Sequence, residues 1–253
     1  MTSKERENKL FVTTSWDDGN PLDMRVAALL DLYQMKGTFY VSKNYVRGGL
    51  QENDIRKLSQ RHEIGAHTIN HPDLTRVSGQ DVRREILGSK VWIEECIKQK
   101  VTSFCYPEGK FNDLITKIVK ESGFTIGRTV EKYDIRQPID LLHFNTSIKV
   151  YPFPFRKKDA RAFYWADLLR PIKKDRELLK KQNISYWKMT NWLSMTKAVF
   201  DEAIKHGSVY HLWGHSWEIE KYNMWKDFEL LLKYISKRSN CIYGTNKELL
   251  SKI

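Results

Sequence analysis

The sequence predicts an α/β protein built as a (β/α) barrel of seven or eight strand–helix units. Short apolar or β-branched runs alternate with stretches at helical spacing, which is typical of a parallel sheet covered by helices. The 253 residues are 41% hydrophobic, enough for one large domain with a substantial core. Four polar clusters, DDG, HTINH, YPEGK and WGHSWE, each follow a predicted strand, where the active sites of such barrels lie.

The N-terminal half contains the more regular units. Leu10 to Ser15 is an apolar and β-branched run that predicts a buried strand, and Pro21 opens a helix that reaches about Met35. Gly37 ends this helix. Further strands are expected over 38–42, 63–66, 101–106 and 124–128, and further helices over 52–60, 79–98 and 111–122.

The C-terminal half begins with a less regular stretch. Residues 129–190 predict an irregular insertion, with a strand near 143–150 and a basic helix near 158–182. A helix near 191–206, a strand over 207–213, a helix over 221–238, a strand near 241–243 and a closing helix are then expected. We therefore expect a short N-terminal extension over 1–9 and one domain over 10–253.

Composition narrows the partners and the location. The absence of a run of eighteen apolar residues excludes a transmembrane helix, and the charged N-terminus lacks the apolar region of a secretory signal, so a cytoplasmic location is expected. Cys96, Cys105 and Cys241 are odd in number and widely spaced, which excludes a disulfide framework.

The net charge of +12 favours an anionic substrate or peripheral contact with lipid head groups. The lysines are spread along the chain, however, and no nucleic-acid motif accompanies them. A solvated basic face is therefore the simpler interpretation, and nucleic acid is not an expected partner.

An adjacent carboxylate pair and two histidines four residues apart suit one hydrolytic metal site. Asp17 and Asp18 lie in TTSWDDG, and His67 and His71 lie in HTINH. One carboxylate and both imidazoles would supply three ligands, the number typical of catalytic zinc, and leave the other carboxylate as a base. At i and i+4 on a helical turn, the imidazoles would share a face. Taken alone, DDGNP is also ordinary turn chemistry.

The cluster YHLWGHSWEIE offers a general acid. His215 is placed to project into a site, whereas His211 falls inside the predicted strand and is expected to be buried, although either could protonate a leaving amine. Glu218 would orient His215 or contact substrate. Trp213 and Trp217 suit stacking on sugar rings, with core packing as the alternative.

The loop YPEGK follows the fourth predicted strand. A backbone N–H in this loop could act in an oxyanion hole. Pro-X-Gly is also ordinary turn chemistry, so the loop by itself is a weak signal.

The order of TTSWDDG, HTINH, FCYPEGKFN and HLWGHSWEIE resembles that of the polysaccharide deacetylase family, carbohydrate esterase family four, with its nodulation-type chitooligosaccharide deacetylase domain. The resemblance runs from about residue 10 to 217. It implies a single distorted (β/α) barrel, with 10–253 as the catalytic domain, and a divalent ion, with zinc favoured over cobalt, nickel or manganese. It also implies hydrolysis of an N-acetyl amide on an amino sugar in a glycan, nucleotide-sugar or lipid-linked sugar, with release of acetate.

The resemblance also implies roles for individual residues. The implied metal ligands are Asp18, His67 and His71. The implied catalytic groups are Asp17 as the general base, the backbone at Tyr106 as an oxyanion donor and His215 as the general acid.

Two features depart from the family pattern. The third motif lacks the arginine that often pairs with the base. Arg128, in IGRTVE, is a candidate substitute because a guanidinium can hold a carboxylate in its ionised form; the alternative is a surface arginine. The aspartate that usually orients the catalytic histidine has no clear match.

Two other functions remain open. A deformylase or a cyclic-amide hydrolase would use the same metal site, and release of formate would distinguish the deformylase. A catalytically silent glycan-binding module would use the tryptophans as stacking platforms. The presence of both aspartates and both histidines argues against a silent module. The sequence does not predict the oligomeric state.

Overall fold

The computed structural model describes residues 9–154, 175–177, 179–181, 184–249 and 251. Most of the expected extension over 1–9 and most of the expected basic helix over 158–182 lie outside these described residues. No helix in the described part of the chain is long and apolar enough to cross a membrane.

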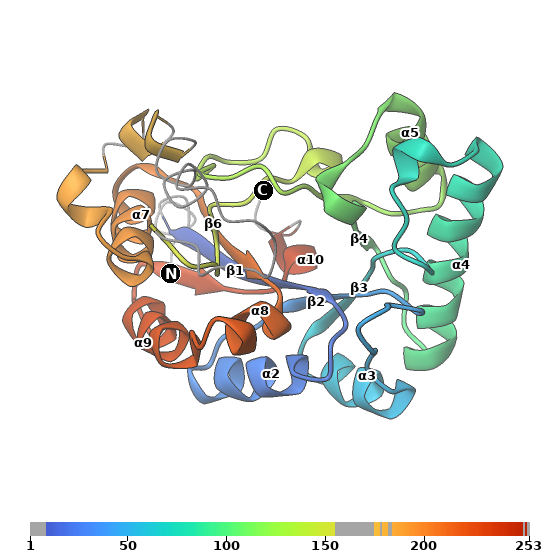
Figure 1. The fold of residues 1–253 in the computed structure, drawn as a ribbon, viewed down its shortest axis with the longest axis horizontal. Helices are drawn as coiled ribbons and strands as arrows, with labels where there is room; N and C mark the ends of the chain where they lie inside the picture. Colours follow the sequence, from blue (N-terminus) through green and yellow to red (C-terminus); the bar gives the residue numbers. More distant parts are fainter. Residues whose placement is uncertain (1–8, 155–174, 178, 182–183, 250, 252–253) are drawn as a thin grey trace, which may run out of the picture.

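Every pairing between the strands of the described sheet is parallel, which confirms the predicted α/β class. The strands are β1 (Leu10–Asp18), β2 (Thr38–Val41), β3 (Glu63–Ala66), β4 (Ser103–Cys105), β5 (Ile126–Arg128), β6 (Ile148–Lys149), β7 (Val209–Gly214) and β8 (Cys241–Tyr243). Seven of them follow in the order β5-β4-β3-β2-β1-β7-β6, and β8 pairs with β1. The curled sheet is a half-barrel, in agreement with the predicted distorted (β/α) barrel (Figure 1).

The helices flank the outside of this sheet, except the last, α10, whose Asn246 bonds Thr13 and Ser15 on the inner face of β1 (Figure 1). They are α2 (Asp23–Leu32), α3 (Glu52–Ser59), α4 (Gly79–Ile97), α5 (Asp113–Glu121), α7 (Trp192–His206), α8 (Ser216–Lys221), α9 (Trp225–Ile235) and α10 (Asn246–Leu249). Short 3-10 turns occupy Leu74–Arg76, Pro107–Gly109, Leu141–His143 and Tyr186–Lys188. The helix expected over 221–238 corresponds to α9, and a further short helix that the sequence did not predict, α8, begins directly after β7. This difference matters because α8 starts at the candidate site.

The irregular segment between β5 and β6 bridges the open side of the half-barrel. The Thr129 N–H donates to the Phe144 carbonyl at 2.9 Å, and the Ser147 N–H donates to the His211 carbonyl at 2.9 Å. The strand expected near 143–150 is reduced to the two residues of β6. The segment thus continues the barrel wall through loop hydrogen bonds instead of a full strand.

The alternation of side chains along β1 explains how the barrel interior is filled. All nine residues of β1 are buried. Val12 belongs to the main core, where Trp16 packs edge-on against Phe228 of α9 at 5.1 Å between ring centroids. Thr13 and Ser15, on the opposite face, hydrogen-bond Asn246 and His211. By this alternation Asp17 is the last inward residue, which places its carboxylate at the mouth of the barrel.

The strand register brings the predicted motifs to one edge of the sheet. Asp18 pairs with Val41, and Val41 with Ala66, so His67 follows at nearly the same level. On the other side of β1, Trp16 pairs with Gly214, and His215 is the next residue along the chain. The predicted convergence at the carboxyl ends of the strands is therefore present in the structure.

Candidate metal centre and catalytic site

The DDG turn at the end of β1 sets the direction of both carboxylates. Asp18 has φ of 81° and Gly19 has φ of 73°, both in the left-handed region. At Gly19 a Cβ would meet Val41 Cγ1 at 2.7 Å, so this position needs glycine on steric as well as conformational grounds. The chain leaves the strand at Asp18, and the Asp18 side chain faces His67 and His71.

Asp18, His67 and His71 converge on one point. The Asp18 Oδ1 lies 3.8 Å from His67 Nε2 and 3.7 Å from His71 Nε2. One ligand atom from each residue lies within 4.8 Å of the others. One carboxylate oxygen and two imidazole nitrogens form the donor set expected of a catalytic zinc ion with an open position, so these residues fit a divalent metal.

The hydrogen bond at Nδ1 of His67, the nitrogen that faces away from Asp18, supports a role as a metal ligand. Its Nδ1 lies 2.8 Å from the Cys105 carbonyl oxygen, which can only accept, so Nδ1 carries the hydrogen and Nε2 presents its lone pair. Burial lowers the pKa of His67 to about 4, which keeps the ring neutral. An imidazole held through its other nitrogen by a backbone carbonyl is the usual arrangement of a metal ligand.

The helical turn expected for HTINH is not formed. Thr68 has φ of 66° and His71 has φ of 53°, so the backbone is left-handed at both residues and cannot continue a helix. Glu85 of α4 accepts from the backbone N–H groups of Ile69 and Asn70 at 2.9 and 2.8 Å. The two imidazoles share the site because this anchored loop turns back, and their ring centroids are 4.6 Å apart.

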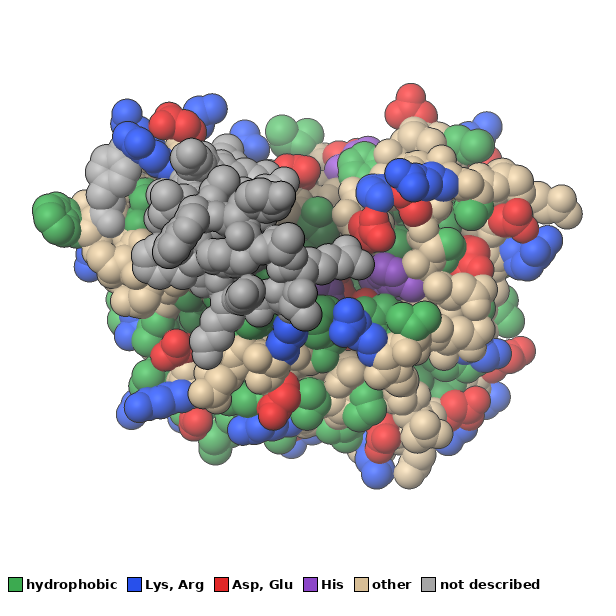
Figure 2. Space-filling model, in the orientation of Figure 1, with side chains coloured by type: hydrophobic (Ala, Val, Ile, Leu, Met, Phe, Trp, Pro, Cys, Tyr) green, Lys and Arg blue, Asp and Glu red, His purple; other side chains and the backbone are tan. Residues whose placement is uncertain are grey.

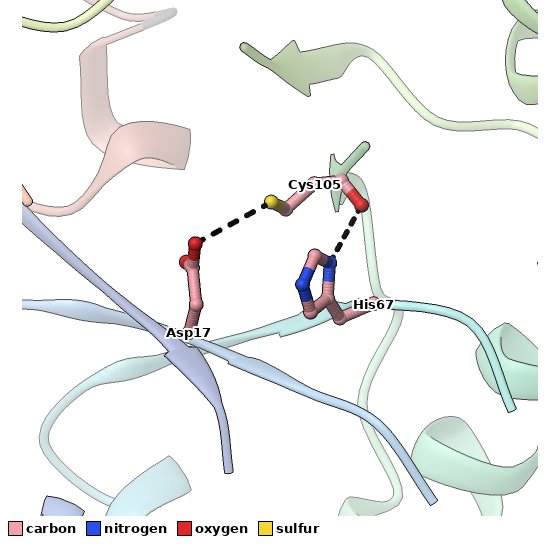
Figure 3. A group of neighbouring side chains, drawn as sticks. All are labelled: Asp17, His67 and Cys105. Atoms are coloured by element: carbon pink, nitrogen blue, oxygen red, sulfur yellow. Dashed lines mark hydrogen bonds between the residues drawn. The ribbon is translucent and has the colours of Figure 1, made fainter. Parts of the chain in front are cut away.

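A second group of possible ligands consists of Asp17, His67 and Cys105, whose side chains point toward one another from β1, the end of β3 and β4 (Figure 3). The Cys105 Sγ is 3.9 Å from Asp17 Oδ2. Burial raises the pKa of Cys105 well above its usual range, which favours the thiol over the thiolate that binds metals. Asp17 is also engaged by Arg128, so the group containing Asp18 is the better candidate for a metal site.

Arg128 and Asp17 form a buried ion pair. The Arg128 guanidinium donates to Asp17 Oδ1, and the Arg128 side chain is fully buried, which rules out the alternative of a surface arginine. Burial by itself would raise the pKa of Asp17, but Arg128, with smaller contributions from His67 and His215, lowers it to about 2. Arg128 reaches Asp17 from β5, two strands beyond the histidine loop.

His215 lies beside both aspartates and is held by a carboxylate. Its Nε2 is 4.0 Å from Asp17 Oδ2 and 3.8 Å from Asp18 Oδ2. Its Nδ1 is 2.6 Å from Glu218 Oε2, and Lys149 lies 2.7 Å from the same oxygen. Glu218 therefore orients the imidazole, one of the two roles considered for it from the sequence.

His211 occupies a different environment, inside the barrel. Its Nε2 is 2.6 Å from Ser15 Oγ and its Nδ1 is 3.0 Å from the Asn145 carbonyl. The ring stacks on Phe144 at 4.5 Å, and burial, with a further contribution from Arg128, lowers its pKa to about 3. The side chain is fully buried and does not line the cleft.

The two tryptophans do not present open faces to the cleft. Trp213 is only 5% exposed, and the Arg128 guanidinium and Lys149 ammonium lie over its ring at 4.7 and 4.9 Å. The Trp217 indole N–H donates to Asp18 Oδ2 at 2.9 Å, and Arg47 covers its ring at 4.3 Å. Trp217 is also absent from the cleft lining in the described part of the chain. The structure gives no support to sugar stacking by Trp217, whereas Trp213 lines the cleft and its contact with a sugar stays a prediction.

The expectation for the Tyr106 backbone also needs correction. Its N–H donates to the Arg128 carbonyl at 3.2 Å, as part of the pairing between β4 and β5, and is not available to a substrate. Glu108, two residues later, has φ of 55° and lines the cleft. Within the described residues its N–H has no acceptor. The sequence alone does not identify this N–H, because the pairing of separate strands decides which N–H groups are already used.

These residues lie at the bottom of an open cleft of about 680 Å³. Figure 2 shows histidine side chains exposed near the middle of this face. Aromatic side chains contribute much of the wall: Tyr45, Tyr106, Tyr133, Tyr151, Phe153 and Trp213. Fold and site together define a parallel half-barrel protein with three residues that could hold a metal ion and a buried, ionised carboxylate beside them.

Comparison with known proteins matches the N-terminal part of the chain to a family. Residues 4–127 match the family described as polysaccharide deacetylase. A peptidoglycan-N-acetylglucosamine deacetylase from Bacillus cereus is 30% identical over 130 residues, which are 49% of this chain and 58% of that protein. Residues 4–127 of the chain are thus similar to the polysaccharide deacetylase family, as the motifs suggested. It spans about half the length of the curated relatives it matches, between 40% and 58% for three of them.

Solved structures agree on the fold along nearly the whole chain. A carbohydrate esterase family four domain of a xylanase, from the hindgut metagenome of Trinervitermes trinervoides, superposes with a TM-score of 0.60 at 13% identity. The match covers 97% of this chain and 91% of that domain. A pseudoenzyme of the same family from Bacillus anthracis superposes with a TM-score of 0.54 at 14% identity, covering 97% of this chain and 66% of that chain. The fold therefore does not distinguish an enzyme from a pseudoenzyme, and the distinction depends on the residues of the site.

Proposed function

We propose that this chain is a metal-dependent hydrolase that removes an N-acetyl group from an amino sugar in a glycan. The observation that carries the proposal is the convergence of Asp18, His67 and His71 beside an ionised carboxylate, Asp17, and a histidine, His215. The family supports N-deacetylation of a glycan as the general activity.

Each side chain has a proposed task. A divalent ion held by Asp18, His67 and His71 would act as a Lewis acid on the acetyl carbonyl and lower the pKa of water. Asp17 is kept ionised by Arg128 and accepts the proton of the attacking water. His215, whose Nδ1 is held by Glu218, presents Nε2 to the cleft and donates a proton to the leaving nitrogen.

The proposed oxyanion donor is the backbone N–H of Glu108, in place of that of Tyr106. Support comes from its position in the cleft wall and from the absence of an acceptor for this N–H among the described residues. The left-handed conformation at Glu108 belongs to the 3-10 turn after β4. A fixed backbone donor at this place would stabilise negative charge on the carbonyl oxygen as it develops.

The described part of the cleft offers little support for an anionic sugar. Its two lysines are each paired with a carboxylate: Lys149 with Glu218 at 2.7 Å and Lys132 with Asp175 at 3.1 Å. We propose an uncharged N-acetylated amino-sugar unit as the group that enters the site.

Metal analysis combined with an acetate-release assay on N-acetylglucosamine oligosaccharides tests this function. We expect zinc at about one ion per chain and acetate release that stops after chelation and returns when zinc is restored. The His71→Ala variant should lose metal and activity together. His206→Ala, a substitution of an exposed histidine at the end of α7, is the matched control and should keep both.

The products distinguish the alternatives. Formate in place of acetate, from N-formylated sugars, would indicate a deformylase on the same site. Ring opening of cyclic amides without acetate release would indicate a cyclic-amide hydrolase. Tight oligosaccharide binding with zinc present and no turnover would identify a silent glycan-binding module and would refute the proposed reaction.

A further inference from the structure

The two oxygens of Asp18 have different neighbours. Oδ1 faces the two histidine nitrogens at 3.8 and 3.7 Å. Oδ2 accepts the hydrogen bond from the Trp217 indole N–H at 2.9 Å and lies 3.8 Å from His215 Nε2. The carboxylate is thus oriented with one oxygen toward the proposed metal position and the other toward the first turn of α8.

Trp217 is itself held in place. Its ring lies against His215, with centroids 5.5 Å apart, and the Arg47 guanidinium covers it at 4.3 Å. Ser216, the preceding residue, donates to Asp23 at the start of α2 at 2.5 Å. The indole therefore approaches Asp18 from a short helix whose first turn is anchored to the neighbouring helix.

We propose that Trp217 is a positioning residue that sets the coordination mode of Asp18. The inference rests on the proposed metal site. With Oδ2 engaged by the indole, Asp18 presents Oδ1 alone, which favours monodentate binding and leaves room for substrate and water. Without the indole N–H, the carboxylate can rotate and offer both oxygens to the ion or turn Oδ2 toward His215.

Tyr45 is a second donor to the same carboxylate. Burial, together with its hydrogen bond to Asp18, raises the pKa of the Tyr45 hydroxyl. Tyr45 lies in the loop after β2, and its ring packs edge-on against His71 at 5.5 Å. Because Tyr45 remains in a Trp217 variant, Asp18 stays partly restrained, and the expected effect is a weakened site and not a lost one.

The zinc dissociation constant of the full chain, measured by competition with a chromophoric chelator, tests the role of Trp217. Loss of a partner in the outer shell of a metal ligand typically weakens affinity by about 10- to 100-fold, and we expect Trp217→Phe to fall in this range. Trp225→Phe is the matched control: it also removes an indole N–H to a carboxylate, from Trp225 to Glu220 at 2.5 Å, but away from the metal ligands. We expect it to stay within about twofold of the wild type.

Two further measurements separate positioning from packing. Trp217→Gln removes the ring but keeps an N–H donor at a similar reach from Cβ, and we expect it to bind zinc more tightly than Trp217→Phe. In the cobalt-loaded protein, the visible bands of Trp217→Phe should weaken relative to the wild type, because a bidentate Asp18 raises the coordination number.

Equal zinc affinities for the wild type and Trp217→Phe would overturn the inference, as would equal affinities for the Phe and Gln variants. If Trp217→Phe does not fold, Trp217→Gln is compared with Trp217→Met: both lack the ring and only the Gln variant keeps an N–H donor, so equal zinc affinities of these two variants would overturn the inference. The assay also separates the two proposals. A wild type that binds zinc but releases no acetate refutes the reaction and leaves the role of Trp217 to be judged by the affinity ratio.

Discussion

Asp17 shows how a single buried pair can prepare a base. A buried carboxylate without a partner tends to hold its proton, which would make it useless as a base at neutral pH. The guanidinium of Arg128 reverses this tendency and lowers the pKa of Asp17 to about 2. In the folded protein the pKa is thus below the ordinary value of about 4, so the pair stabilises the fold above about pH 4 and loses that contribution as the pH falls toward 2.

Removal of Arg128 should affect both stability and catalysis. In Arg128→Met we expect the free energy of unfolding to fall by about 3 kcal/mol or more at neutral pH, because Asp17 is left as an unpaired buried charge. The pKa of Asp17 should rise, and the acidic limb of the pH profile of kcat/KM should move to higher pH. Urea unfolding and the pH–rate profile measure the two effects. The double variant with Asp17→Asn should recover part of the lost stability, and an unmoved acidic limb would contradict the proposed role.

The two histidines of the β7 region should respond differently to the same substitution. His215→Gln should lower kcat by about 10²- to 10⁴-fold with zinc binding retained, because it removes the proposed general acid. His211→Gln should instead lower the free energy of unfolding by about 1–3 kcal/mol, because it disturbs buried hydrogen bonds to Ser15 and Asn145. Steady-state kinetics and urea unfolding of both variants test this. A larger loss of kcat in His211→Gln would reverse the assignment of the acid.

At the scale of elements, the first turn of α8 holds the acid half of the site. His215 precedes this helix, and Ser216, Trp217 and Glu218 contact Asp23, Asp18 and His215 in turn. The helix predicted over 221–238 is α9, whose apolar spacing is the stronger pattern, and α8 was not predicted. The short α8 is stabilised by these side-chain contacts, which a periodicity argument does not detect.

Asp23, at the start of α2, should give the stability a characteristic pH dependence. Burial, and to a smaller extent Asp18 and Asp17, raises its pKa well above the ordinary value. Its contribution to stability is therefore fully present below about pH 4 and is lost as the pH rises through the raised folded-state pKa. In Asp23→Asn this decline should disappear. Urea unfolding between pH 5 and 8 measures the slope, with Asp227→Asn, an exposed aspartate in the first turn of α9, as the control. Identical slopes in Asp23→Asn and the wild type would contradict the assignment.

At the scale of the whole molecule, strand–helix alternation and the order of the polar clusters were sufficient to predict the parallel barrel and the edge where the site lies. The convergence of Asp18 with His67 and His71 could be predicted because β1 and β3 both end at that edge. Local periodicity could not predict the left-handed backbone at His71, because the turn is imposed by Glu85 on another helix. The use of the Tyr106 N–H within the sheet also depends on a pairing between separate strands.

The role of Arg128 could be predicted from the sequence only in part. Its role as a partner of Asp17 was considered from the sequence, but the alternative of a surface residue could be removed only by the strand order, which brings β5 to the inner mouth of the half-barrel. The family match ends at residue 127, so neither Arg128 nor His215 is supported by that match. Both assignments depend on geometry, and they are therefore the residues at which mutagenesis is most informative.

A bound metal should stabilise the whole fold, because its three ligands come from two separate segments, the end of β1 and the loop after β3. A ligand that binds only the folded state adds about 2.7 kcal/mol at a free concentration 100 times its dissociation constant, and each kcal/mol shifts Tm by about 2–4 °C at this chain length. Chelation should therefore lower Tm by about 5–10 °C, reversibly on return of zinc. In His71→Ala the same chelator should leave Tm unchanged, whereas His206→Ala should respond as the wild type does. A wild-type Tm that does not depend on chelator or zinc, measured by differential scanning calorimetry, would contradict the metal site itself.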